Sequence, residues 1–595
     1  LRIKMLVADV GGKKGFYNVS QRLYREAMDT AKVHYGENSV LYDNIEHNFA
    51  SALHDMGQYE RSKQLNEKCL ARREKMYGTY NDKYAVSLLN LASDCGALFE
   101  FDSAFQYYNL YLDITEKVSG RESQNYATGL NNLSNIFSKI SDFENAIKYL
   151  VDAVVIMEKI DFKSEDFYTF KHNLTVMYKD KGDLSKSLTM SLALEKEVVK
   201  NFGDFNPTYF SILHHQAMCY KSLGNWQKDV DLNLRCLELR KVFHGIYHPE
   251  TYMSYFNYMI TFNQMDNQEE RKAYIDTCLL ISDSIFGPKS EQYALSLSNM
   301  AMFNRDNNKL LLAEETLHEV IVLLTGILGD SSLSVADPAN SLALVYTDMS
   351  NYDEAIKYTK QALGINEYVW GASHVGNVAY WSNLFWIYLL MNAYNSADSI
   401  ATKSLNLLYT DYIHNLSSLT ENERQDYKLD INNKLYALLN YSIFRQRSTP
   451  DLYSTAYQYW INMNGLLNNS SSKQAEQIKR SNDDEVIKLY DNYRKLSKQI
   501  SLYNEKPKEQ LHQMGIDMIA LDEQVVSLER ELNAKVSGFT NDKKQYTYTD
   551  LTNDLNRHEV FIDIIALPLI DTASWNWTSE LRYLVNISSP KWDTP

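Results

Sequence analysis

The sequence predicts an all-α protein: an α-solenoid superhelix of about nine two-helix units, then a helical linker region with an antiparallel helical hairpin, and a short terminal β-hairpin. Three observations predict this fold. A bulky side chain recurs at spacings of 42 residues, once 41, along two thirds of the 595-residue chain. Apolar residues recur at spacings of three and four on both sides of it, which is the helical period. The chain has only nine prolines and 22 glycines, the residues that interrupt helices.

The 42-residue units share one internal order. The bulky residue, which we call the anchor, follows a turn signal such as Ser350-Asn351, and a small residue such as Ala355 lies three positions after it. We expect the anchor at the turn between two helices and the small residue where the second helix packs on the first. One hairpin cannot bury its apolar face alone, so stacked hairpins would form a continuous core and a concave surface. The anchors are Tyr59, Phe101, Phe143, Leu184, Trp226, Gln268, Leu310, Tyr352 and Tyr394.

Two units depart from this order. In the sixth, Gln268 and Arg271 replace the large and the small residue, so this unit is expected to be distorted. At the start, Tyr17 lies 42 residues before the first anchor, which indicates half a unit and an array cut at its N-terminus. The predicted segments are an N-terminal tail over 1–14, the repeat array over 15–410, the helical linker and hairpin over 411–545, and a further truncated domain over 546–595.

Asparagine recurs eleven residues before the anchor, although it is a poor helix-interior residue. Two interpretations remain open. Each amide, which offers a donor and an acceptor together, pairs with the backbone of an extended peptide in the concave groove; or each bonds a carbonyl of the neighbouring hairpin and sets only the stacking. We call these residues the asparagine ladder: Asn48, Asn90, Asn132, Asn173, Asn257, Asn299 and Asn383, with His215 and Ser341 at the two remaining positions.

A second column lies three residues after the ladder. It is polar at Ser51, Ser93 and Asn135 and apolar afterwards, from Val176 to Trp386. The column either lines the groove or belongs to the core between repeats. Three residues further on, positive charges recur, which would suit a peptide with apolar anchors and some acidic residues. These cations are Lys179, Lys221 and Arg305.

Composition excludes several classes of function. The net charge of −16 argues against direct nucleic-acid binding and against anionic membranes, because both repel an acidic protein. A run of 18 apolar residues, as a spanning helix needs, is absent. The five cysteines are odd in number and widely spaced, which indicates buried unpaired thiols in a reducing, cytoplasmic setting.

Other chemistry is weighed and set aside. His244 and His248 lie near Glu250, but a turn histidine before a proline explains them better than a metal site does. Adjacent histidines on a helix, such as His214-His215, diverge by about 100° and do not converge on one metal. The glycine-rich segment 11–15 lacks phosphate-loop spacing. No cofactor and no metal are expected.

With these residues in place, the 42-residue units resemble tetratricopeptide repeats of the kinesin-light-chain-like type. The resemblance covers about residues 15–410. It implies a superhelix whose ladder position faces a concave groove that binds a protein or an extended peptide.

After the array the periodicity changes. Residues 421–444 and 452–467 read as amphipathic helices, and 468–472 as a loop. Two heptad stretches, 486–503 and 514–532, with a turn signal at 504–507, predict the antiparallel hairpin, two separate surface helices being the alternative. Then 560–567, ended by Pro568, and 581–587 predict two strands.

The order of these segments, with the runs 548–551 and 559–563, resembles the approach to a CHAT domain, a caspase-like cysteine peptidase domain of bacterial repeat proteins. The resemblance implies that the array recognises a partner or substrate for such a protease, in a setting such as bacterial defence. Its catalytic His and Cys cannot be placed in this chain, which is expected to be inactive as it stands. The alternative is a non-enzymatic adaptor resembling kinesin light chain.

Overall fold

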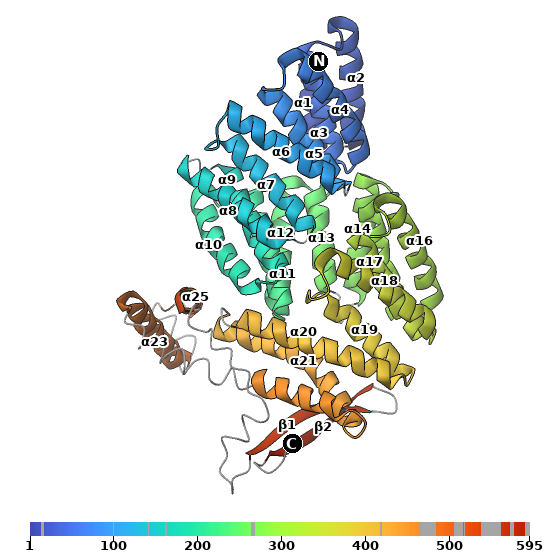
Figure 1. The fold of residues 1–595 in the computed structure, drawn as a ribbon, viewed down its shortest axis with the longest axis vertical. Coiled ribbons are helices and arrows are strands. Elements are labelled where there is room, and N and C mark those ends of the chain that lie inside the picture. The colour runs from blue at the N-terminus through green and yellow to red at the C-terminus, as the bar shows by residue number, and fades with distance from the viewer. Residues whose placement is uncertain are drawn as a thin grey trace. The chain divides into compact units, whose positions relative to one another are not determined.

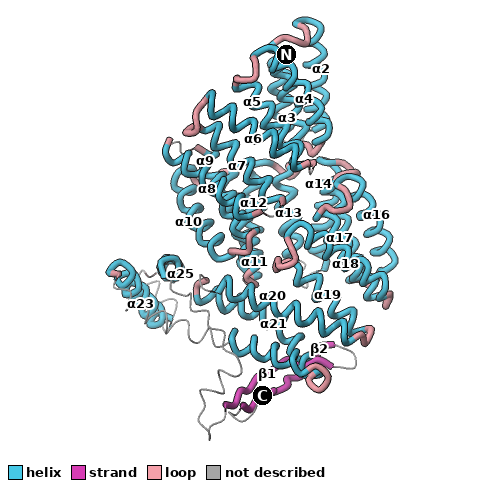
Figure 2. Tube along the Cα trace, in the orientation of Figure 1, coloured by secondary structure: helices cyan, strands magenta, loops and turns pink. Residues whose placement is uncertain are grey.

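Helical hairpins fill most of the computed structural model of this protein (Figure 1). The structure describes residues 1–13, 17–98, 100–140, 142–160, 164–262, 268–416, 419–463, 483–504, 516, 518–536, 561–571 and 576–588. Helices run through nearly all of these segments, and strands occur only near the C-terminus, as Figure 2 shows. The predicted all-α solenoid with a small terminal β-hairpin is therefore confirmed.

Each hairpin of the array consists of a first and a second helix. The first helices are α1 (Arg2–Lys13), α3 (Val40–Asp55), α5 (Asp82–Ala97), α7 (Gln124–Lys139), α9 (Glu165–Asp180), α11 (Pro207–Ser222), α13 (Pro249–Phe262), α15 (Glu291–Asp306), α17 (Leu333–Asp348) and α19 (Asn377–Leu390). The second helices are α2 (Tyr17–Tyr35), α4 (Tyr59–Tyr77), α6 (Phe101–Val118), α8 (Phe143–Lys159), α10 (Leu184–Phe202), α12 (Trp226–His244), α14 (Gln268–Phe286), α16 (Leu310–Leu328), α18 (Tyr352–Trp370) and α20 (Tyr394–Leu416).

Every anchor is the first residue of a second helix, from Tyr17 in α2 to Tyr394 in α20. The small residue three positions later is buried, as Ala104 and Ala355 show with no exposed surface. This confirms the predicted turn and the predicted close packing within each hairpin. Hairpins also pack on their neighbours: α5 contacts α6 within its own hairpin and α4 of the preceding one.

The sixth unit keeps the register although its anchor and small residue are replaced. Helix α14 begins at Gln268 and spans 19 residues, as α12 and α16 do. Arg271, in the place of the small residue, is buried and forms an ion pair with Asp306 on α15 at 2.6 Å. The paired guanidinium of Arg271 thus occupies a position where most units have a small residue. The expected distortion is not seen in α14.

The first helices begin at side-chain caps that recur in phase with the repeat. The oxygen of Ser123, for example, accepts the backbone N–H of Tyr126, and the oxygen of Asn206 accepts that of Tyr209. Such caps satisfy N–H groups that have no partner inside the helix. His248 is a member of this column, since its Nδ1 accepts the backbone N–H of Glu250 at 3.1 Å. The histidine before Pro249 therefore has a structural role.

The chain divides into two compact units. The first comprises residues 1–181, 190–221 and 226–372, and the second comprises 182–189, 222–225 and 373–595. Within the first unit, hairpins that are far apart in sequence meet. The ring of Tyr17 on α2 lies 6.2 Å from that of Phe286 on α14, measured between centroids. Phe143 on α8 stacks on Trp370 on α18 at 5.8 Å.

Residues 2–13 form helix α1 rather than the expected tail, and α1 leaves apolar side chains in water. Ile3 is 78% exposed and Val7 is 48% exposed. The residues in the same repeat positions on α3, Ile45 and Phe49, are 0% and 4% exposed. The face of α1 that corresponds to the buried face of later first helices is therefore open to solvent.

In the second unit, α20 is followed by α21 (Glu421–Arg445). The helix predicted over 421–444 is present, and it starts with a capping box between Thr420 and Glu423. Asp398 on α20 accepts hydrogen bonds from Tyr441 and Arg445, at 2.6 and 2.7 Å. Residues 450–463 form a further helix.

The predicted antiparallel hairpin is present as α23 (Asp484–Asn504) and α25 (Met518–Val536), which contact each other. Val486, at the start of α23, and Leu532, near the end of α25, are buried in the same cluster. Lys535 and Glu485 form an ion pair at 2.8 Å, so the two helices run in opposite directions. The predicted loop at 468–472 and turn at 505–507 lie outside the described residues.

The strands are longer than predicted. β1 (Phe561–Asp571) pairs antiparallel with β2 (Asn576–Ser588). The sequence placed the end of the first strand at Pro568, but β1 continues past it with an irregular register between Pro568 and Ile570. A proline cannot donate to the ladder, and strands accommodate it at edges and bulges. The runs at 548–551 and 559–560 lie outside the described residues.

Candidate functional site

The asparagine ladder lies on the part of the first helices that is neither core nor fully exposed. All seven asparagines are partly exposed. Their neighbours toward the core are buried, as Leu91 and Ala92 beside Asn90 show with 1% and 0% exposure. The ladder therefore follows the border between the core and solvent along successive first helices.

Three ladder amides donate to side chains on the first helix of the preceding repeat. Nδ2 of Asn90 on α5 donates to Oγ of Ser51 on α3 at 3.3 Å. Nδ2 of Asn173 on α9 donates to Oδ1 of Asn131 on α7 at 2.9 Å, and Asn257 contacts the imidazole of His214 at 3.4 Å. The stacking interpretation expected backbone carbonyls as partners, whereas the partners here are side chains.

Two further ladder contacts stay within one helix. Asn132 accepts a hydrogen bond from Nδ2 of Asn131 at 3.0 Å, and Asn299 donates to the carbonyl of Leu295 at 3.0 Å. An amide that donates through Nδ2 still has an oxygen that can accept a hydrogen bond. The contacts between repeats thus fix the orientation of Asn90, Asn173 and Asn257.

The column three residues after the ladder is partly exposed along its whole length. Its apolar members in the first unit lie on α9, α11, α13, α15 and α17, and Met218 is 40% exposed. Met253, seven residues before Ile260 on α13, is 42% exposed. We call the following set the apolar stripe: Val176, Met218, Ile260, Met302 and Leu344, each 42 residues from the next.

The polar start of this column belongs to the same face. Ser51 accepts the amide of Asn90, and Ser93 exchanges a hydrogen bond with the hydroxyl of Tyr108 at 2.8 Å. The first-helix face is therefore polar over α3, α5 and α7 and apolar over α9 to α17. Trp386 and Asn383, at the same positions of α19, lie in the second unit and are partly exposed.

The three candidate cations have acidic neighbours in their own chain. Arg305 binds Asp348 through Nε at 2.6 Å and through a second nitrogen at 3.2 Å. Lys179 lies 3.3 Å from Asp180. Burial lowers the pKa of Lys221, and the nearby carboxylates of Asp229 and Asp337 oppose that effect. An acidic ligand would have to compete with these carboxylates.

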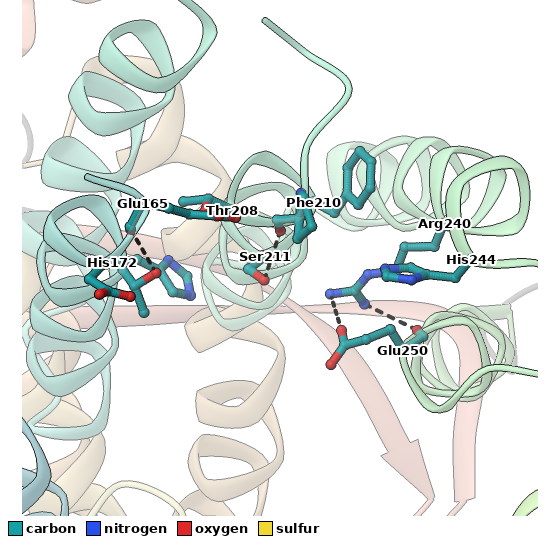
Figure 3. Close-up of a pocket in the computed structure, with 11 residues that line it drawn as sticks. Glu165, His172, Thr208, Phe210, Ser211, Arg240, His244 and Glu250 are labelled. Carbon is teal, nitrogen blue, oxygen red and sulfur yellow. Dashed lines mark hydrogen bonds and ion pairs between the residues drawn. The ribbon is translucent and has the colours of Figure 1, made fainter. Parts of the chain in front are cut away.

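A small pocket of about 290 Å³ lies beside the ladder face, between the starts of α9 and α11 and the turn from α12 to α13 (Figure 3). Arg240 crosses one wall and binds Glu250 at 2.7 Å. His172 lines the opposite side, and burial lowers the pKa of its imidazole to about 4. The pocket is lined by Glu165, Asp166, Thr169, His172, Pro207, Thr208, Phe210, Ser211, Arg240, His244 and Glu250.

The histidines of this region pack on one another without converging on an ion. The rings of His244 and His248 stack with centroids 3.9 Å apart, and those of His172 and His215 meet edge to face at 5.6 Å. Among the described residues, no group of three or more His, Cys, Asp or Glu side chains is arranged to hold a metal ion.

The five cysteines are buried, and none of them forms a disulfide. Burial raises the pKa of the thiols of Cys95 and Cys278 to about 12. A nucleophilic cysteine needs the opposite shift, because the thiolate is the reactive form. The pKa shifts of Cys95 and Cys278 therefore oppose nucleophilic reactivity. In the described part of the chain, no helix is long and apolar enough to cross a membrane.

Sequence reasoning missed the residues that hold the ladder. Asn131 and His214 each lie one residue before a ladder position, where the periodic pattern marks only the ladder itself. The recurrence of polar residues at 47, 131, 172, 214, 298 and 340 was the available signal. Met253 was missed because several other units have a polar or small residue at the equivalent position of the first helix.

Comparisons with known proteins agree with the repeat geometry. The family profile described as tetratricopeptide repeat matches residues 41–117, 84–159 and 292–367. No curated protein matches the chain. The repeats in these three segments thus match the tetratricopeptide repeat.

Several solved structures are similar to parts of the chain. One is a putative kinesin light chain from Podosopora anserina with nearly identical TPR-like repeats; it is 18% identical, with 35% of this chain and 98% of that chain covered and a TM-score of 0.30. A second is BtubC (BKLC) from P. vanneervenii, at 21% identity, 39% and 94% coverage and a TM-score of 0.32. A third is the apo quorum sensor NprR from B. thuringiensis, at 14% identity, 61% and 98% coverage and a TM-score of 0.42.

Proposed function

We propose that the array is a protein-interaction scaffold whose first-helix face binds an extended segment of another protein. The observation that carries the proposal is that ladder amides and an apolar stripe share one partly exposed face over successive repeats. The ladder would pair with ligand backbone, since an amide matches both groups of a peptide unit. The stripe would receive apolar side chains.

The three candidate cations have a supporting role in this proposal. Lys179, Lys221 and Arg305 lie one turn beyond the stripe, and their acidic neighbours already balance their charge. We assign them to the rim of the binding face, where they would hold first helices together and contact the ligand backbone.

The experiment uses peptides selected on the chain from a random 15-residue display library. We expect Asn90→Ala combined with Asn132→Ala to weaken the selected peptides about 10-fold, the loss expected for one or two hydrogen bonds. Asn109→Ala, at an exposed asparagine of the second helix α6, is the matched control and should leave affinity unchanged. Unchanged affinity in the ladder variant would show that the ladder does not pair with the ligand backbone. Loss of helicity, measured by circular dichroism, would favour the stacking role.

We further propose that this scaffold is the recognition part of a CHAT-type cysteine protease, with the helical region coupling capture to the peptidase. The terminal hairpin supports this proposal. Ile565 and Leu567 of β1 are buried, whereas Leu581, Tyr583 and Val585 of β2 are 58%, 66% and 50% exposed. An apolar face of this kind suits a sheet with additional layers, since two strands alone are marginally stable.

The sequence that follows residue 595 in the gene tests the protease proposal. It requires a His-Gly pair and a cysteine at the end of a later strand within the next few hundred residues. A bacterial defence setting, in which the protease cleaves an effector, belongs to the same proposal. A non-enzymatic adaptor resembling kinesin light chain is the alternative, and it requires no peptidase there.

A further inference from the structure

The ends of α10 and α12, and the loops that follow them, carry exposed apolar side chains. Phe205 and Tyr247 each lie two residues after the glycine that ends the second helix. The next three loops of the array have polar residues at this place, namely Lys289, Ser331 and Ser373. We call the following set the loop patch, whose members are each between 41% and 49% exposed: Phe202, Phe205, Phe243, Ile246 and Tyr247.

The loop patch joins two repeats and reaches the pocket. The ring centroids of Phe205 and Phe243 lie 5.3 Å apart, which connects the two loops. Phe210, which lines the pocket, has its ring 5.9 Å from that of Phe205 and 5.6 Å from that of Phe243. Exposed apolar side chains that gather in this way, unlike single ones, are typical of binding surfaces. The loop patch and the pocket therefore form one surface, and it belongs to the first unit.

The pocket has room for one side chain of a ligand. Its volume of about 290 Å³ falls just below the range of about 300–1,000 Å³ that is typical of sites for small molecules. An anchor side chain that fills a pocket beside less specific contacts is common at protein–protein interfaces. The occupant that fits is thus a segment of a partner protein, with its anchor in the pocket and the neighbouring side chains on the loop patch.

Charge restricts the nature of the anchor. Among the residues that line the pocket, Glu165, Asp166 and Glu250 contribute carboxylates and Arg240 contributes a guanidinium. This guanidinium is only 5% exposed and already has partners, since it binds the carboxylate of Glu250 at 2.7 Å and the carbonyl of that residue at 3.3 Å. Burial lowers the pKa of His172 to about 4, so its imidazole is neutral at pH 7. The pocket therefore presents a net negative charge, which suits a basic anchor.

Arginine suits this surface better than lysine does. Glu165 and Asp166 are exposed at the start of α9, and Asp166 accepts the neutral amide of Gln124 at 2.9 Å. A planar guanidinium binds carboxylates through parallel hydrogen bonds and also stacks on aromatic rings. Such rings lie where the pocket meets the loop patch, because the ring of His244, which lines the pocket, is 4.7 Å from that of Phe243 (Figure 3).

We propose that the loop patch and the pocket form a second docking surface, which binds a segment of a partner protein that carries an arginine flanked by apolar residues. The guanidinium enters the pocket toward Glu165 and Asp166, and the flanking side chains cover the rings of Phe205 and Phe243. The inference goes beyond the proposed function, because no residue of the asparagine ladder or the apolar stripe takes part in it.

The test selects peptides on the full chain from a random display library, with counter-selection on a Phe205→Ser and Phe243→Ser double variant. We expect the enriched peptides to carry an arginine next to an aliphatic or aromatic residue. Citrulline in place of that arginine keeps the shape and removes the charge. It should weaken binding about 10-fold in fluorescence anisotropy, because a charge-assisted hydrogen bond is lost.

Variants locate the site. Glu165→Gln combined with Asp166→Asn should weaken the selected peptides about 10-fold, for the same reason. The matched control is Glu269→Gln combined with Glu270→Gln, at an exposed acidic pair in the first turn of α14, and it should have no effect. Tyr368→Ser, at an exposed tyrosine of α18, is the control for the phenylalanine variant. Circular dichroism verifies that each variant is folded, and the variant of the α9 acids replaces the phenylalanine variant in the counter-selection if the latter is not.

Three results would overturn the inference: no peptide that survives the counter-selection, enriched peptides without a basic residue, or equal affinity of the arginine and citrulline forms. Selected peptides that lose binding in the Asn90→Ala and Asn132→Ala double variant would place the ligand on the ladder, which would overturn the inference and support the proposed function. Peptides that keep their affinity in that variant and lose it in the variant of Glu165 and Asp166 would support the inference, whatever the ladder binds.

Discussion

Nδ2 of Asn173 donates to Oδ1 of Asn131 across 2.9 Å, so a ladder amide of one repeat is held by the first helix of the repeat before it. Asn131 in turn donates to Asn132, the ladder residue of its own helix. Two ladder positions are thus joined through a residue that is not in the ladder. The pair links stacking and recognition, because the bond that fixes the distance between repeats also orients the amide.

A double-mutant cycle on this pair measures the stacking contribution. Asn173→Ala and Asn131→Ala should each lower the free energy of unfolding by about 1 kcal/mol, with a coupling energy of about 0.5–1 kcal/mol, because a shared hydrogen bond is lost only once. Urea denaturation followed by circular dichroism supplies the values. Strictly additive losses would show that the bond contributes nothing, and Asn109→Ala gives the background for an exposed asparagine.

Helix α18 contains two glycines at which one substitution should have opposite effects. Gly371, which ends the helix, has a φ of +85°, whereas an added Cβ at Gly364 within the helix meets no atom within 4 Å. Gly371→Ala should destabilise the protein by about 1 kcal/mol, because an L-residue strains in the left-handed region. Gly364→Ala should stabilise it by about 0.5–1 kcal/mol through helix propensity. The same sign for both, by thermal denaturation, would contradict these backbone assignments.

Buried histidines should make the fold sensitive to mild acid. Burial lowers the pKa of His47, His172 and His214 to about 4. The unfolded chain, with a histidine pKa near 6.5, then binds protons before the folded chain does. Stability is therefore fully present above pH 6.5 and falls toward pH 4, by up to about 1.4 kcal/mol per pH unit for each histidine.

Urea midpoints between pH 7.5 and 4.5 measure this slope. His172→Gln should flatten it, because glutamine takes up no proton in either state. His34→Gln, at an exposed histidine of α2, is the control and should leave the slope as it is. A His172→Gln slope equal to that of the unmodified protein would contradict the assigned cause.

Asp398 should be a stability determinant of the second unit. It accepts hydrogen bonds from Tyr441, Arg445 and Thr449; burial works to raise its pKa, but these bonds outweigh that effect and lower it. Asp398→Asn should cost about 2–3 kcal/mol, since it leaves a largely buried guanidinium without its counter-charge. Asp113→Asn, in a solvent-exposed pair with Lys117, should cost much less, because water screens the pair. Similar losses in urea denaturation would contradict the distinction.

Periodicity was sufficient to place the helices, because each anchor must occupy the one turn that a two-helix unit provides. Tyr59, Phe143 and Tyr352 begin their helices as the 42-residue spacing predicts. Periodicity could not predict which side chains form hydrogen bonds with the ladder asparagines. Whether Asn257 meets a carbonyl or the ring of His214 depends on the rotation between neighbouring hairpins, which a linear pattern does not encode.

Local rules also failed where the surroundings compensate. A proline was expected to end the first strand, yet an irregular register carries β1 beyond Pro568. An arginine in place of a small residue was expected to disturb the sixth unit, yet Asp306 pairs with Arg271 beside the ring of Phe303. In both cases the compensating group lies elsewhere in the sequence and is visible only in three dimensions.

The two terminal helices of the array differ in what they offer to a neighbour. Helix α21 seals α20 with a network of polar bonds, whereas α1 presents Ile3, Val7 and Val10 with about half or more of each side chain bare. A hairpin grafted onto α1 in the existing register would cover these apolar side chains, whereas a hairpin stacked on α20 would first have to break the bonds between Asp398 and α21.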